Sequence, residues 1–156
     1  MEQMNQAYKV FTRICLNNWH YIDRKVLGLN ESINFFTGHS GSGKSTVIDA
    51  MQIVLYANTD GRGFFNKAAA DDSDRSLIEY LRGMINIGEN NQAEYKRNKN
   101  FSTTIVLEME QTTTKEKECI GVVFDVETAT NEINRLFFWH KGELIPGDYQ
   151  IGRAHV

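Results

Sequence analysis

The chain carries the stretch Gly38-His39-Ser40-Gly41-Ser42-Gly43-Lys44-Ser45, which fits the pattern G-x-x-x-x-G-K-[ST] at every fixed position. Its glycines allow positive φ angles, so that successive backbone N–H groups can turn inward around a phosphate. Lys44 adds a positive charge that can reach the β- and γ-phosphates, and the Ser45 hydroxyl is placed to coordinate Mg²⁺. The stretch therefore predicts a phosphate loop that binds a nucleoside triphosphate.

The flanking segments support this interpretation over that of a merely flexible Gly/Ser-rich loop. Residues 32–37 are typical of a short buried strand, and residues 46–56 lack Gly and Pro over about three helical turns. The positive end of such a helix would face the bound phosphates. We expect ATP and Mg²⁺ as cofactors, Lys44 as the catalytic residue and Ser45 as the metal ligand. The predicted nucleotide-binding residues are Gly38, His39, Ser40, Gly41, Ser42, Gly43, Lys44, Ser45 and Thr46.

Composition sets the broad class. In 156 residues, 41% are hydrophobic and 24% are charged, which are values of a globular domain. The formal net charge of −3 gives no basic signature for nucleic acid, so that any DNA contact would need a local patch. No apolar run approaches the ~20 residues of a membrane helix, and residues 1–18 do not resemble a signal peptide. We therefore expect a cytoplasmic protein with no membrane partner.

The first half of the chain predicts three strands, the last of them at 32–37, and two helices. Residues 8–19 form a first strand, and a polar turn at 23–25 leads to a second at 26–29. In the helix at 46–56, the polar side chains Asp49, Gln52 and Tyr56 share one narrow stripe, which predicts burial on most other sides.

Residues 58–75 show neither helical nor strand periodicity and predict a loop. A short helix follows at 76–82 and ends at Gly83. Residues 88–100 are polar, and we interpret their basic cluster of Lys96, Arg97 and Lys99 as a solvated loop rather than a DNA contact.

From Phe101 onward the hydrophobic period changes to two. Alternation over 105–110 and again over 120–126, with a third run at 133–139, predicts an antiparallel meander with short polar connections. Cys15 and Cys119 lie in strand-like apolar surroundings and are expected to be buried, reduced thiols. The four histidines show no metal-ligand spacing.

A phosphate loop followed by a helix and an antiparallel meander resembles the N-terminal lobe of ABC-type ATPase heads. The run Ser45-Thr46-Val47-Ile48-Asp49-Ala50-Met51, after Leu16-Asn17-Asn18-Trp19, is similar to the heads of SMC/MukB-like chromosome-organising ATPases. The stretch from Asp74 to Gly83, with its Leu81-Arg82-Gly83, most resembles the JetC-type subunits of the Wadjet plasmid-defence systems. Ser40 replaces the asparagine common in SMC loops, and His39 occupies a variable position.

The resemblance implies an α/β fold of the P-loop NTPase class, an ABC-type N-terminal lobe with a central P-loop helix and an antiparallel β-meander. Residues 1–150 would form this lobe of an incomplete ABC/SMC-type head, because the Leu-Ser-Gly-Gly signature and Asp-Glu pair of the family come from a C-terminal lobe. It also implies a second ATPase head as a homodimer partner, DNA, and kleisin-type subunits. The full-length protein would hydrolyse ATP, whereas this lobe alone would be inactive.

Three other classes remain open, and the weakest of them is a non-catalytic interaction module, whose activity would not need Lys44. A DNA-repair ATPase of the RecN or RecF sort shares the head, and a stand-alone P-loop kinase-like enzyme would need parallel strands, which the meander disfavours. Residues 151–156 match the translation of a sequencing-adapter read-through, and we expect a non-native tail.

Several single residues carry two interpretations. Trp19, His20 and Tyr21 end the first strand, where ABC-type heads place groups beside adenine, although Trp19 suits core packing equally. Arg82 resembles an SMC arginine that faces nucleotide or DNA, or is a helix-end cation. Asp49 is expected to be a buried carboxylate that fixes backbone or basic groups. Asp125, with Glu127 nearby, mimics a Mg²⁺ carboxylate, but its alternating surroundings favour a hairpin strand.

Overall fold

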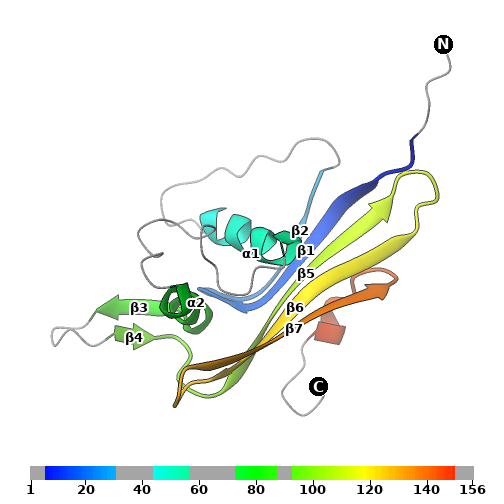
Figure 1. Cartoon of the computed structure of the whole chain (residues 1–156). Coiled ribbons are helices and arrows are strands. Elements are labelled where there is room, and N and C mark those ends of the chain that lie inside the picture. The colour runs from blue at the N-terminus through cyan, green and yellow to red at the C-terminus, as the bar shows by residue number, and fades with distance from the viewer. Residues whose placement is uncertain (1–5, 31–43, 57–72, 88–92, 150–156) are drawn as a thin grey trace.

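A five-stranded antiparallel sheet forms the body of the chain in the computed structural model, which describes residues 6–30, 44–56, 73–87 and 93–149 (Figure 1). Its order is β2-β1-β5-β6-β7. The predicted meander is confirmed as three consecutive hairpin-linked strands, and β1 joins it by pairing with β5. The strands are β1 (Lys9–Trp19), β2 (Ile22–Gly28), β5 (Phe101–Gln111), β6 (Lys117–Glu127) and β7 (Glu132–Lys141).

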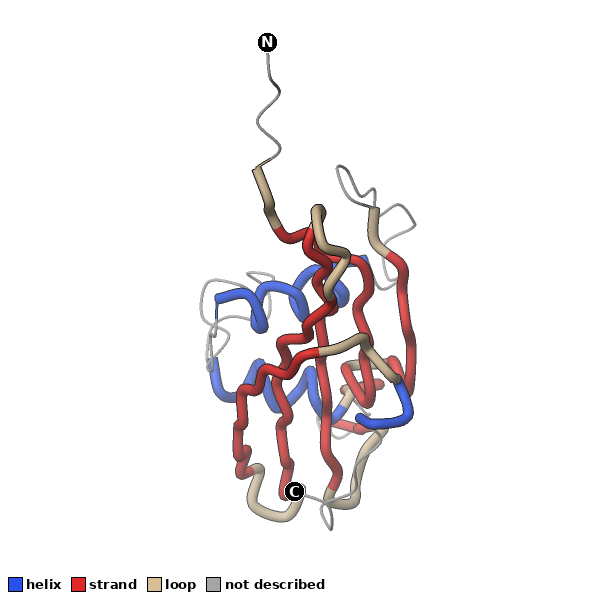
Figure 2. Tube along the Cα trace, turned by 90° about the vertical axis from the view of Figure 1, so that its right-hand side faces the viewer, coloured by secondary structure: helices blue, strands red, loops and turns tan. Residues whose placement is uncertain are grey.

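The two faces of this sheet are covered by different elements. Helices α1 (Lys44–Tyr56) and α2 (Ser73–Arg82) lie on one face, and the short 3-10 helix η2 (Pro146–Tyr149) lies on the other (Figure 2). A second, two-stranded sheet pairs β3 (Met84–Ile87) with β4 (Ala93–Tyr95) after α2. The predicted α/β composition with an antiparallel sheet is thus confirmed, whereas β4 lies inside the segment that we expected to be a polar loop.

The main core lies between the sheet and the helices and contains alternate side chains of the central strands. Alternate side chains of β1, β5 and β6 point to this face, where they meet Val47, Ala50 and Ile53 of α1 and Leu77 and Leu81 of α2. Burial of these apolar side chains is the dominant favourable term in folding. The strand side chains of this core are Ile14, Leu16, Trp19, Ile105, Leu107, Val122, Phe124 and Val126.

The opposite face carries a smaller cluster that holds the C-terminal segment. Cys15, Val106 and Cys119 are buried there beneath Leu144 and Tyr149. Burial raises the pKa of both thiols, and both cysteines are free. The prediction of two buried, reduced cysteines is confirmed.

Glu108 ties three segments together on this face. Its side chain is 1% exposed and accepts hydrogen bonds from Arg13 Nη2 at 2.7 Å, from Thr12 Oγ1 at 2.7 Å and from the Leu144 N–H at 2.7 Å. Burial alone would raise the pKa of Glu108, but these donors and the charge of Arg13 outweigh it and lower the pKa to about 2. The carboxylate is therefore charged in the folded protein and bonds β1, β5 and the C-terminal segment to one another.

The turn between the first two strands differs from the prediction. His20 and Tyr21 form it, and residues 23–25 lie within β2 instead of in a turn. Positive φ angles of 53° at Asn18 and 53° at His20 allow the chain to reverse there. β2 is an edge strand of the sheet, which explains why its polar residues 23–25 are exposed and imitate a turn in the sequence.

Helix α1 confirms the predicted helix at 46–56 and begins two residues earlier, at Lys44. Asp49, at 5% exposure, is buried, whereas the apolar Ile48 and Leu55 are 39% and 41% exposed. The prediction of burial on most sides is thus met only in part, because two apolar side chains are exposed while the carboxylate of the polar stripe is buried. The reason is that the Asp49 carboxylate faces a phenol donor from α2.

Helix α2 confirms the second predicted helix and starts at Ser73, three residues before the predicted start. Its expected stop is also confirmed, because Gly83 follows its last residue with φ of +68°. The expected strand at 32–37, the remainder of the expected loop at 58–72 and the expected tail at 151–156 lie outside the described residues. Within the described part of the chain, no helix combines the length and the apolar character needed to cross a membrane.

Candidate functional site

The start of α1 carries the predicted phosphate site. Lys44 and Ser45 occupy its first turn, so the predicted order of loop and helix agrees with where the helix begins. The backbone of 38–43 and the side chains of Lys44 and Ser45 lie outside the described residues. The N–H groups of a first helical turn have no partners within the helix and carry its positive dipole end, which suits an anion.

Trp19 anchors this first turn to the sheet. Its indole N–H donates to the Thr46 carbonyl at 2.8 Å, and its side chain is fully buried in the main core. Thr46 itself is 8% exposed. Because the ring is enclosed, it is not available to stack on a base, and core packing is the correct one of the two interpretations of Trp19. This hydrogen bond therefore joins the end of β1 to the start of α1.

Asp49 links α1 to α2, one turn further along. The Tyr80 hydroxyl donates to Asp49 Oδ2 at 2.8 Å. Burial raises the pKa of Asp49, an effect that the bond from Tyr80 opposes, and both burial and this carboxylate raise the pKa of Tyr80. Asp49 is buried as predicted, but the partner that the structure gives it is a phenol, not a basic group.

A row of neighbouring aromatic rings extends from the Tyr80–Asp49 hydrogen bond to the protein surface. The Tyr80 ring centroid lies 5.4 Å from that of Trp19 and 4.7 Å from that of His20, which in turn lies 3.8 Å from that of Tyr21. Burial, and next the nearby charge of Arg97, lower the pKa of His20 to about 4, so its imidazole is neutral at pH 7. Tyr21 is 54% exposed. Of the three residues expected near a base, Tyr21 therefore offers the most accessible ring.

Arg97 corrects the interpretation of the basic cluster as a solvated loop. Its guanidinium is buried, with the residue 8% exposed, and donates to the carbonyls of His20 at 2.6 Å, Leu81 at 2.8 Å and Ile22 at 2.9 Å. Asp23 lies 3.6 Å away as its counter-charge. Lys96, Arg97 and Lys99 lie close together in a polar segment, and nothing in their sequence distinguishes the buried one from the exposed ones. The buried role of Arg97 could therefore not be predicted.

Arg82 is engaged within the protein. It donates to the Arg97 carbonyl at 3.1 Å, to Asn131 Oδ1 at 3.1 Å and to Asn98 Oδ1 at 3.2 Å, and its guanidinium lies 4.1 Å from the Tyr95 ring centroid. These contacts join the end of α2 to β4 and to the β6–β7 turn. They agree with the interpretation of Arg82 as a helix-end cation that stabilises the fold.

Asp125 lies within antiparallel strand β6, paired with Asn134 of β7, and accepts a hydrogen bond from the Ser102 hydroxyl. The favoured interpretation of this segment as a hairpin strand is confirmed. Among the described residues, no group of three or more potential ligands is arranged to hold a metal ion.

One family model matches the part of the chain that carries the predicted phosphate loop. Residues 11–72 match the family model described as the P-loop containing region of AAA domain. This match includes the predicted phosphate loop, β2, α1 and all of β1 except its first two residues, and it supports a P-loop ATPase N-terminal region with nucleotide binding as its expected property. A search of curated proteins found no match.

Proposed function

We propose that residues 38–46 bind ATP with Mg²⁺, with Lys44 on the β- and γ-phosphates and the Ser45 hydroxyl on the metal ion. The observation on which this proposal rests is the hydrogen bond from the Trp19 indole to the Thr46 carbonyl. It fixes the start of α1 against the sheet, so the amides of the first helical turn, from residue 44 onward, are positioned before the ligand arrives. Preorganised donors of this kind lose less entropy on binding.

The base would lie beside His20 and Tyr21. The neutral imidazole, packed at a tilt against the rings of Tyr21 and Tyr80, forms with them an apolar, partly exposed surface at the end of β1. Tyr21→Ala should therefore weaken ATP binding several-fold and leave inorganic triphosphate binding unchanged, as measured by calorimetry. Equal loss for both ligands would contradict this placement of the base.

For the whole protein, we propose an ATPase head of the SMC/MukB-like class, of the Wadjet type. In that arrangement two heads would enclose ATP and Mg²⁺ between them, and hydrolysis would drive cycles of head engagement that act on DNA together with kleisin-type subunits. Support comes from the resemblance of the loop, helix and Leu81-Arg82-Gly83 sequences. A RecN- or RecF-type repair ATPase is the second candidate, since it shares the head.

A kinase-like enzyme is the weaker alternative. Such enzymes continue after the phosphate loop with parallel strands, whereas every described strand pairing in this chain is antiparallel. The favoured head would need carboxylates from a second lobe to activate water.

The test combines binding and turnover. The chain alone should bind ATP with Mg²⁺, and Lys44→Ala should weaken binding at least tenfold, while Lys25→Ala on β2 serves as the charge control. Phosphate release should stay at background for the chain alone. Unchanged affinity in Lys44→Ala would refute the phosphate site, and rapid turnover by the chain alone would refute the need for a second lobe.

A further inference from the structure

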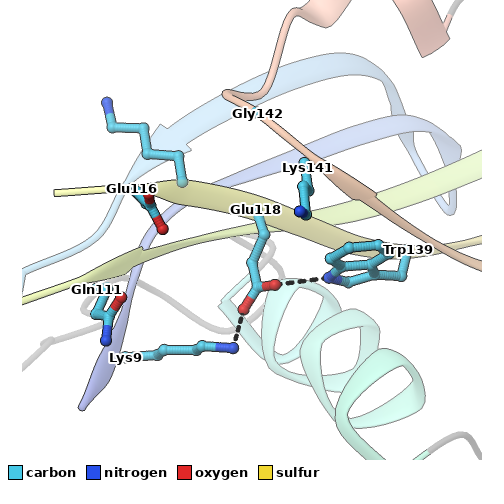
Figure 3. A pocket seen from close by; sticks show the side chains of 8 residues that line it. Lys9, Gln111, Glu116, Glu118, Trp139, Lys141 and Gly142 are labelled. Atoms are coloured by element: carbon cyan, nitrogen blue, oxygen red, sulfur yellow. Dashed lines mark hydrogen bonds and ion pairs between the residues drawn. The ribbon is translucent and has the colours of Figure 1, made fainter. Parts of the chain in front are cut away.

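A pocket of about 450 Å³ opens at the far end of the sheet, on the face that carries α1 (Figure 3). It lies beside the β5–β6 connection and the end of β7, and its lining includes Lys9, Lys117, Glu118, Trp139 and Lys141. These side chains belong to strands β1, β6 and β7, and none belongs to the phosphate loop. A pocket of this size matches the range of small-ligand sites.

One large aromatic ring is presented in this pocket. Trp139 is 53% exposed, and its indole N–H donates to Glu118 Oε2 at 2.7 Å (Figure 3). The hydrogen bond fixes the edge of the ring and thereby its orientation. A tryptophan held in this way offers its face to a flat partner at little entropic cost.

The charges around the ring favour an anion. The second oxygen of Glu118 pairs with the Lys9 ammonium, so this carboxylate is already compensated by Lys9 and Trp139. In the parts of the chain that the structure describes, Lys141 forms no ion pair within 4 Å, although its charge, after the bonds from Lys9 and Trp139, also helps to lower the pKa of Glu118. With Glu116 as the second carboxylate, lysines outnumber acidic groups in the lining.

We propose that this pocket binds a nucleotide unit, with its base stacked on Trp139 and its phosphate at Lys141, which lies on the same face of β7. An exposed tryptophan among lysines is the combination that binds bases and phosphates without sequence readout. An acidic peptide would use the lysines but would leave the ring without a matching partner. The nucleotide unit is supplied either by a free mononucleotide or by a single-stranded nucleic acid.

The test uses dTMP and pentathymidylate as probes, because neither carries the triphosphate that the phosphate loop requires. The chain has two tryptophans, so its two indole N–H resonances can be assigned with Trp139→Phe. Both probes should shift the Trp139 resonance and leave that of buried Trp19 in place. Markedly tighter, salt-sensitive binding of pentathymidylate would identify single-stranded nucleic acid as the source, and equal affinity would identify the mononucleotide.

Variants separate this site from the phosphate loop. Trp139→Ala and Lys141→Glu should each lower affinity about tenfold, whereas Lys25→Glu, the same charge change on the opposite edge strand, should not. Lys44→Ala should leave probe binding intact. An unmoved Trp139 resonance, loss of binding in Lys44→Ala, or a response to polyglutamate but not to dTMP would each overturn the proposal.

Discussion

Arg97 shows at the residue scale how one buried cation organises the region next to the proposed site. Its guanidinium satisfies carbonyls from the β1–β2 turn, the start of β2 and the end of α2. Arg97→Met keeps much of the side-chain volume but removes the guanidinium donors to these carbonyls, one in a buried contact and two in partly buried ones. We expect a loss of about 3 kcal/mol in the free energy of unfolding, measured by urea denaturation.

Lys99→Met is the matched control, because Lys99 is exposed in the same segment. Its effect should stay within about 0.5 kcal/mol. Equal stability of the two variants would show that the Arg97 bonds contribute nothing.

Glu108 makes stability depend on pH in a defined window. Its pKa of about 2 in the folded protein lies below the ordinary value of 4.5, so the unfolded chain binds more protons between these values. Its contribution is complete above about pH 4.5 and should be lost as the pH falls towards 2. Glu108→Gln should cost about 3 kcal/mol at pH 7 and flatten this part of the profile. An unchanged slope in the variant would contradict the assignment.

Gly83 sets the element-scale boundary between α2 and β3. Its φ is +68°, and a Cβ at this position would lie 2.7 Å from the His20 carbonyl oxygen. Gly83→Ala therefore combines backbone strain with a backbone clash, and we expect a loss of about 2 kcal/mol in thermal or chemical denaturation.

Two other glycines separate these contributions. Gly142 has φ of +99° with open space around it, so Gly142→Ala should show the conformational cost alone, about 1 kcal/mol. Gly28 has neither feature and should tolerate alanine. If Gly83→Ala lowers the free energy of unfolding no more than Gly142→Ala does, the steric clash with the β1–β2 turn contributes nothing.

Elements with a clear period were predictable from the sequence, and those defined by edge position or by long-range contacts were not. Alternation in residues 105–126 predicted β5 and β6 because one face of each strand is buried in the main core. β2 was placed too late because its exposed residues 23–25 lack an apolar alternation. The outward orientation of Ile48 and the inward one of Asp49 depend on Tyr80, which lies far along the chain.

Considered across the whole molecule, the motif of the candidate site could be predicted from the sequence. The long-range hydrogen bonds around that site could not. The loop pattern and the helix that begins at Lys44 follow from local sequence. The hydrogen bond from Trp19 to Thr46 spans 27 positions of the sequence, and that from Arg97 to His20 in the β1–β2 turn spans 77. No local sequence pattern encodes contacts of such separation. These contacts, with the aromatic rings between them, join the sheet and both helices next to the start of α1.

The most direct measurement is a titration of the folded chain with ATP and Mg²⁺, followed by the backbone amide resonances of residues 38–46. We predict large, saturable shifts there, and their loss in Lys44→Ala with the remaining spectrum preserved. Resonances that stay unmoved in a well-folded sample would contradict the claim that this loop holds a nucleoside triphosphate.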